Sequence, residues 1–104
     1  MGKRLLIISN LDSSEPFGAF TRPFYLGQYL VEHFDVQQLG LDCSSVDYAP
    51  SISVGSRSLK SYIKSVQKCI DEFNPDFIYA QETRPSIAAL IALKLKNSQS
   101  CPLV

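Results

Sequence analysis

The chain alternates short apolar runs with longer amphipathic segments, which is the pattern of strands followed by helices. Apolar runs that predict strands lie at residues 5–8, 36–41, 77–80 and 101–104, with a short one near 52–54. The first run is continuously apolar, as expected for a strand that is buried on both faces of a parallel sheet. The last run predicts the start of a strand that continues beyond it.

Three segments keep the spacing of helices. The first runs from Thr21 to about His33, with Thr21 as the cap and Pro23 in the first turn, where a missing N–H costs nothing. The second ends before Pro75, because proline disfavours helix in the preceding residue. Its apolar stripe is Leu59, Ile63, Val66, Ile70 and Phe73. The third, residues 86–95, is apolar almost all round, which predicts burial on more than one side.

Strands that alternate with helices predict an α/β fold, a three-layer Rossmann-like or flavodoxin-like parallel sheet with right-handed crossovers. The usual winding makes the first strand and the strand at 77–80 neighbours. The sheet is expected to be truncated after about the fourth main strand. We therefore interpret residues 1–104 as a single N-terminal domain of a larger two-domain protein.

Composition narrows the class of protein. Basic and acidic residues both number 10, so the net charge is zero and the basic excess of a nucleic-acid binder is missing. Three cysteines form no CxxC, and there is a single histidine, which predicts a reducing compartment and no metal site. The apolar run near the N-terminus is too short for a signal peptide or a membrane span. A cytoplasmic domain is expected.

Ligands of open parallel sheets bind at the carboxyl ends of the strands. This rule selects the loops at residues 9–21 and 80–85 as the candidate site. In the first loop, Gly18 and Ala19 precede a helix start, where free N–H groups suit a phosphate or carboxylate and a glycine lets a ligand approach the backbone. Thr21 and Arg22 belong to the same candidate site. The sequence has neither GxGxxG nor GxxxxGK[ST], which argues against a dehydrogenase-type dinucleotide site and a Walker NTPase.

In the second loop, Gln81, Glu82 and Arg84 follow a strand. A carboxylate and a guanidinium in this place either bind sugar hydroxyls or pair with each other across the helix start. Asp12 and Glu15 are interpreted as solvated loop residues. Cys69 is interpreted as a core residue, and no pair of nucleophile and base can be assembled.

The order of these segments resembles the N-terminal domain of GT-B glycosyltransferases, in particular the large retaining group called family 4. The segments that carry the resemblance are residues 5–10, 16–26, 74–82 and 102–104. The third is similar to that family's pattern of x-P-D, hydrophobic, I-H-A-H-D. Tyr79 and Gln81 stand in place of its two histidines, Phe17 replaces a glycine, and His33-Phe34 stands where G-H usually closes the first helix.

The resemblance implies that this domain holds a glycan or glycolipid acceptor. The C-terminal domain that binds the nucleotide-sugar donor is missing from the chain, so the fragment alone is expected to be inactive. It also implies a role in polysaccharide biosynthesis without cofactor or bound metal, at the inner face of a membrane. The resemblance implies that Gly18 is the residue where the backbone approaches the ligand. It implies a ligand contact for Glu82 as well, on a weaker match to the family's pattern.

Two other classes of protein stay open. One is a non-catalytic binding module, flavodoxin-like or receiver-like, although Asn10, Asp12 and Glu82 match a receiver poorly and Glu15-Pro16 interrupts a flavodoxin-type loop at Ser13-Ser14. The other is an interaction domain whose apolar helix at 86–95 docks a partner. Self-association of the truncated form through that helix is a further expectation.

Overall fold

The structure of the chain is a computed structural model that describes residues 3–13, 21–56, 58–81 and 83–96. Its elements are β1 (Arg4–Ile8), α1 (Thr21–Leu30), β2 (Asp35–Gly40), β3 (Ser51–Ser53), α2 (Leu59–Phe73), β4 (Phe77–Ala80) and α3 (Thr83–Lys96). The predicted strand at 101–104 lies outside the described residues. For the rest, the predicted elements are present in the predicted order.

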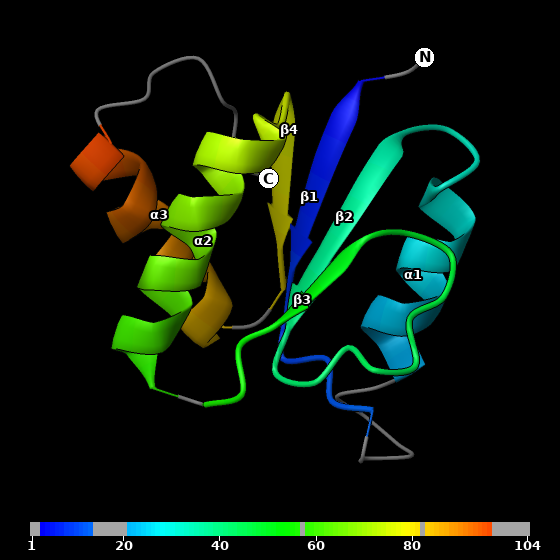
Figure 1. The fold of residues 1–104 in the computed structure, drawn as a ribbon, viewed down its shortest axis with the longest axis horizontal. Helices are drawn as coiled ribbons and strands as arrows, with labels where there is room; N and C mark the ends of the chain where they lie inside the picture. Colours follow the sequence, from blue (N-terminus) through cyan, green and yellow to red (C-terminus); the bar gives the residue numbers. More distant parts are fainter. Residues whose placement is uncertain (1–2, 14–20, 57, 82, 97–104) are drawn as a thin grey trace.

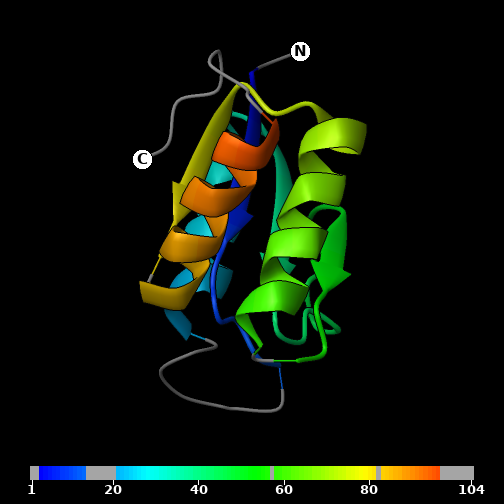
Figure 2. The same ribbon diagram turned by 90° about the vertical axis from the view of Figure 1, so that its left-hand side faces the viewer.

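The strands form one parallel sheet in the order β3-β2-β1-β4. Helix α1 covers one face of the sheet, and α2 and α3 lie side by side on the other, which makes three layers (Figures 1 and 2). The fold class is thereby confirmed as a Rossmann-like α/β sheet. The predicted neighbours are also confirmed, because Leu5 pairs with Phe77 and Ile8 with Ala80.

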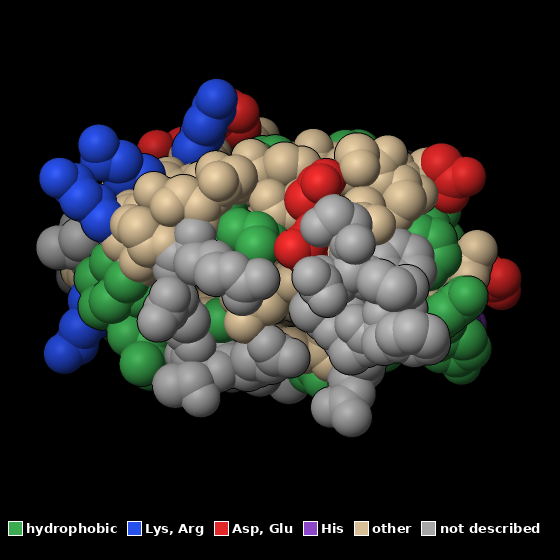
Figure 3. All heavy atoms as spheres, turned by 90° about the horizontal axis from the view of Figure 1, so that it is seen from below, with side chains coloured by type: hydrophobic (Ala, Val, Ile, Leu, Met, Phe, Trp, Pro, Cys, Tyr) green, Lys and Arg blue, Asp and Glu red, His purple; other side chains and the backbone are tan. Residues whose placement is uncertain are grey.

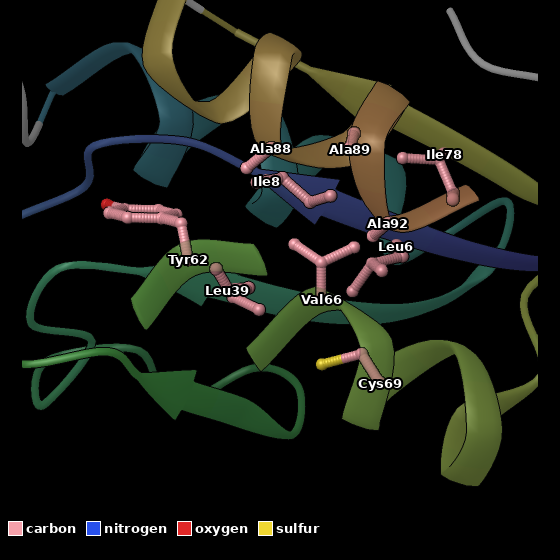
Figure 4. Close-up of a cluster of buried hydrophobic side chains, with 10 residues drawn as sticks. All are labelled: Leu6, Ile8, Leu39, Tyr62, Val66, Cys69, Ile78, Ala88, Ala89 and Ala92. Carbon is pink, nitrogen blue, oxygen red and sulfur yellow. The ribbon is translucent and has the colours of Figure 1, made fainter. Parts of the chain in front are cut away.

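The main core lies between the sheet and the α2–α3 layer (Figure 4). Its fully buried members are Leu6, Ile8, Leu39, Tyr62, Val66, Cys69, Ile78, Ala88, Ala89 and Ala92. The alanines of α3 let that helix lie close to the sheet, while Leu6 and Ile8 fill the space beneath. Cys69 is buried in this core, as its interpretation required.

The opposite face is covered less completely. Leu5, Ile7 and Val36 form a second cluster, on which Leu30 of α1 and the following Phe34 pack. A shallow apolar groove of about 270 Å³ remains beside α1, and we call it the α1-side groove. Its lining residues are Leu5, Leu30, Phe34, Phe77 and Tyr79. Among the described residues, Phe77 and Tyr79 of β4 are only partly buried on this face.

Helix α2 ends where its sequence predicts, before Pro75, and both of its ends are capped. The hydroxyl of Ser58 caps its start by accepting a hydrogen bond from the N–H of Ser61 at 3.2 Å. Asn74 ends it in the left-handed conformation, with φ 53°, and its N–H donates to the carbonyl of Ile70. A short polar residue tolerates this conformation better than most residues do, so the chain can turn sharply into β4.

The structure differs from the expectations in two details. Helix α1 ends at Leu30, and hydrogen-bonded turns replace the predicted last turn to about His33. Helix α3 begins at Thr83, within residues 81–85 where its start was expected. Its apolar surface is only partly buried, because Ile87 and Leu90 are 41% and 54% exposed. The prediction of burial on more than one side is thus wrong for these two residues within the described chain.

Candidate functional site

The ends of β1 and β4 lie next to each other at the carboxyl edge of the sheet. The N–H of Gln81 donates to the carbonyl of Ile8 at 2.9 Å, and the N–H of Ser9 donates to the carbonyl of Leu39 at 3.0 Å. The chain therefore leaves three adjacent strands at one edge, and the first residues beyond β1 and β4, Ser9 and Gln81, are polar. This is the edge at which open parallel sheets bind ligands.

The turn after β1 is fixed by its own side chains and by α2. The hydroxyl of Ser9 accepts a hydrogen bond from the N–H of Leu11 at 3.1 Å. The hydroxyl of Tyr62, a fully buried residue of α2, lies 3.0 Å from the carbonyl oxygen of Ser9 and 3.2 Å from Oδ1 of Asn10. The Asn10 side chain is consequently held in place from the core.

Sequence reasoning missed Tyr62. Its place on the inner face of α2 could have been found, because Tyr62 lies three residues after Leu59 and four before Val66, on the same stripe of the helix. Its contact with the turn after β1 could not have been found, because the two partners are 53 residues apart in the chain.

Polar pairing continues beyond the ends of β1 and β2. Asp12 and Asp42 form a parallel bridge, and the N–H of Ser13 donates to the carbonyl of Asp42 at 2.8 Å. The hydroxyl of Ser13 also accepts from the N–H of Ser45 at 3.0 Å. Asp12 is only 7% exposed, so its interpretation as a solvated loop residue is wrong. Long-range pairing with Asp42 brings it into the molecule.

Cys43 lies next to this region without being a reactive thiol. Burial, with the negative charge of Asp42 as a smaller cause, raises the pKa of Cys43 from 9.0 to about 12. The thiol is therefore neutral at physiological pH. Because the thiolate is the nucleophilic form of cysteine, Cys43 contributes packing at this edge and no nucleophile.

Gln81 presents a polar atom that the fold leaves without a partner. Its Oε1 is buried and accepts no hydrogen bond in the structure. An unsatisfied buried polar atom costs about 1–3 kcal/mol. Such atoms are rare in folded proteins, but Oε1 of Gln37 on β2 is in the same situation, so Gln81 is distinguished by its place at the strand end. Gln81 is the member of the predicted site whose side chain the structure describes, and it lies at the expected edge.

The other predicted site residues are only partly described. Gly18, Ala19 and Glu82 lie outside the described residues. The backbones of Thr21 and Arg22 form the start of α1, and that of Arg84 lies in the first turn of α3. Their side chains are not described. The two helix starts lie on opposite faces of the sheet at the same edge (Figures 1 and 2), so they flank the strand ends.

Charges are distributed unevenly around this edge. Seen from it, basic side chains gather on the side of α2 and α3, with a few acidic ones behind them, and further acidic side chains lie near the centre and on the opposite side (Figure 3). No group of three or more His, Cys, Asp or Glu in the described residues could hold a metal ion. In the same part of the chain, no helix is long and apolar enough to cross a membrane.

The fold and the strand-end site define a Rossmann-like α/β domain. No family model and no curated protein matches the sequence. A solved structure from Listeria monocytogenes, assigned as a UDP-N-acetylglucosamine 2-epimerase, matches it with a TM-score of 0.56 and 18% identity. The match covers 100% of this chain and 30% of that one, so the chain spans under a third of its length. At this identity the likeness shows the fold alone, a Rossmann-like α/β domain.

Proposed function

We propose that the chain is the N-terminal, acceptor-side domain of a nucleotide-sugar-dependent glycosyltransferase. The observation that carries the proposal is the set of polar groups at the carboxyl edge, where Asn10 is held by Tyr62 and Gln81 keeps a buried oxygen without a partner. A fold shared with a protein named for a nucleotide-sugar reaction supports the same class.

Amide side chains suit the recognition of sugar hydroxyls, because a hydroxyl both donates and accepts hydrogen bonds. In the proposed role, Asn10 and Gln81 bind hydroxyls of a glycan or the glycan part of a glycolipid. Gly18, Ala19, Thr21, Arg22, Glu82 and Arg84 complete the proposed site. A second domain would bind the donor and stabilise its diphosphate leaving group, so this chain alone should transfer no sugar. We place the whole protein in the cytoplasm, at the inner face of a membrane.

A second candidate function is favoured by the matching structure itself. The chain would then be one domain of an enzyme that epimerises a UDP-sugar, the activity named for that protein. The two functions differ in what this edge of the sheet should bind. An acceptor-side domain binds a glycan, whereas the epimerase alternative predicts binding of UDP or of the UDP-sugar.

Nuclear magnetic resonance on the ¹⁵N-labelled chain separates these functions. We would titrate it with UDP, UDP-N-acetylglucosamine, a panel of oligosaccharides and flavin mononucleotide, and follow the side-chain amide signals of Asn10 and Gln81. The proposal predicts that an oligosaccharide shifts both signals. In Gln81→Ala, the shift of the remaining Asn10 signal should disappear. Both shifts should persist in Gln28→Ala, a matched control on the exposed side of α1.

Each other outcome contradicts the acceptor-side function. Shifts at these signals with UDP but with no oligosaccharide would favour the epimerase alternative. A response to the flavin would favour the non-catalytic binding module. A spectrum that no ligand changes would mean that this edge binds none of them.

A further inference from the structure

The pairing of β2 with β3 stops partway along β2, at a proline. The N–H of Gln38 donates to the carbonyl of Pro50 at 3.0 Å, and the N–H of Val54 donates to the carbonyl of Gly40 at 2.8 Å. Two residues earlier, the same parallel ladder would need an N–H from residue 50, which a proline does not have. Val36, near the start of β2, therefore lies beyond the paired part of the strand.

The main chain of Val36 offers one donor and one acceptor on this outer side. The N–H of Asp35 donates to the carbonyl of Lys3 on the side of β1, and successive residues of a strand point to alternate sides, so Val36 points away from β1. Among the described residues, none is hydrogen-bonded to the main chain of Val36 on this side. Val36 is nevertheless only 3% exposed. Buried main-chain groups are nearly always paired, so these two groups suit a bound amide.

A pocket of about 460 Å³ opens beside Val36. It is lined by residues from the starts of β1 and β2, the end of α2 and the loop before β3. We call it the amino-edge pocket, because it lies at the amino ends of the strands, at the top of Figure 1 and opposite the candidate site. Its volume is within the range of about 300–1,000 Å³ that is usual for ligand sites. Val31, Phe34 and Val36 give it an apolar floor.

The charges around the amino-edge pocket favour a cation. Arg4, Asp35 and Glu72 line it, which makes one positive and two negative side chains. The guanidinium of Arg4 donates to the carbonyl of Phe73, at the end of α2, at 3.1 Å, so this positive charge already has a partner of opposite polarity. Asp35 and Glu72 are exposed carboxylates. Their excess negative charge complements a basic group.

We propose that the amino-edge pocket binds an extended peptide segment of another protein, in which a basic residue alternates with apolar ones. A peptide residue that pairs with the main chain of Val36 would place its side chain over the apolar floor, on the α1 side, where Val36 itself packs. Side chains of a strand alternate between its faces. The next peptide residue would therefore point to the α2 side, toward Asp35 and Glu72, where a lysine or arginine fits.

This inference does not depend on the proposed function, because it uses the opposite edge of the sheet. Nuclear magnetic resonance on the ¹⁵N-labelled chain tests it, with the blocked tripeptide acetyl-Val-Lys-Val-amide as the probe. We expect the amide proton of Val36 to move downfield as it gains an acceptor, while the side-chain signals of Asn10 and Gln81 stay in place. Acetyl-Val-Glu-Val-amide should bind about tenfold more weakly or worse, because it brings like charges together.

A pair of double variants tests the two carboxylates. Asp35→Asn/Glu72→Gln should weaken binding of the lysine tripeptide about three- to tenfold, as expected for two exposed ion pairs. Glu32→Gln/Asp47→Asn is the matched control, because it removes the same two charges at exposed positions outside the pocket. Its affinity for the tripeptide should stay within about twofold of that of the unaltered chain.

Four results would overturn the proposal. An unmoved Val36 amide would exclude main-chain pairing, and equal affinity for the two tripeptides would exclude recognition of the basic residue. An equal loss of affinity in the two double variants would mean that the chain attracts cations generally and not in this pocket. Butylamine is a cation without an amide, so if it shifts the Val36 signal as much as the tripeptide does, the occupant is a small cation and no peptide.

Discussion

Gly27 illustrates how closely α1 approaches the sheet. A Cβ atom at this position would overlap Nε2 of Gln38 and lie 2.6 Å from the hydroxyl oxygen of Tyr48. That hydroxyl accepts a hydrogen bond from Gln38 at 2.7 Å and donates one to the carbonyl of Phe24 at 2.8 Å. The glycine leaves room for this network, which ties the loop after β2 to α1.

We predict that Gly27→Ala destabilises the chain, although alanine is the better helix former by about 1 kcal/mol. The overlap with Gln38 and Tyr48 should outweigh that gain and lower the free energy of unfolding by about 1–3 kcal/mol. Urea unfolding followed by circular dichroism measures this change in the free energy of unfolding. Gln28→Ala, at the exposed neighbouring position, is the control and should be neutral or slightly stabilising. Equal stability of the two variants would contradict the close packing.

Burial raises the pKa of Cys43 and Cys69 from 9.0 to about 12. Both thiols should therefore resist modification by Ellman's reagent at pH 8 in the folded chain and react once urea unfolds it. A Cys101→Ser background isolates the two buried thiols. Above pH 9.0 the unfolded chain loses thiol protons that the folded chain keeps until about pH 12. The free energy of unfolding should fall across this range, and a urea midpoint that stays constant would contradict the burial.

At the scale of elements, the contact between α2 and the turn after β1 links the core to the candidate site. The Tyr62 hydroxyl is the donor in that contact, and its acceptors are the Ser9 carbonyl and the Asn10 side chain. The ring itself is packed within the core (Figure 4). Removing only the hydroxyl therefore leaves the packing intact and deletes the link.

Tyr62→Phe should lower the free energy of unfolding by about 1–3 kcal/mol, because the buried Ser9 carbonyl loses its hydrogen bond to this hydroxyl. It should also release the Asn10 side chain and shift its amide signals in the nuclear magnetic resonance spectrum. Tyr25→Phe, at a position 57% exposed on α1, is the matched control and should change neither. An unchanged Asn10 signal in Tyr62→Phe would mean that the core does not orient this side chain.

At the scale of the whole molecule, the sequence predicts the layers better than it predicts the site. The apolar run at residues 5–8 and the stripe on α2 reflect local periodicity, and both were confirmed. The burial of Asp12 depends on its pairing with Asp42, 30 residues away, and the hydrogen bond of Tyr62 depends on Ser9, 53 residues away. Local periodicity does not encode such distant pairs. Gln81 was selected by its place after a strand, but its buried oxygen without a partner emerges only from the folded chain.

The outer surface of α3 gives a test of this layering. Leu90 is 54% exposed, whereas its neighbour Ala89 is fully buried. Leu90→Glu should change the free energy of unfolding by less than about 0.5 kcal/mol, and Ala89→Glu should prevent folding because it places a charge in the core. Thermal unfolding measures the effect of both substitutions on stability.

If the proposed self-association uses this helix, Leu90→Glu should also reduce self-association in sedimentation experiments. Failure of Leu90→Glu to fold would show that this surface is covered in solution.

The uneven distribution of charge makes the neutral chain an electric dipole. Residues 23–56 contain Glu32, Asp35, Asp42 and Asp47 with no lysine or arginine, and residues 57–70 contain Arg57, Lys60, Lys64 and Lys68 with no acidic residue. Two such molecules attract each other when unlike sides meet, even at zero net charge. Salt screens that attraction, with a range of about 10 Å at 0.1 M ionic strength. The chain should therefore be salted in near its isoelectric point, dissolving least in pure water.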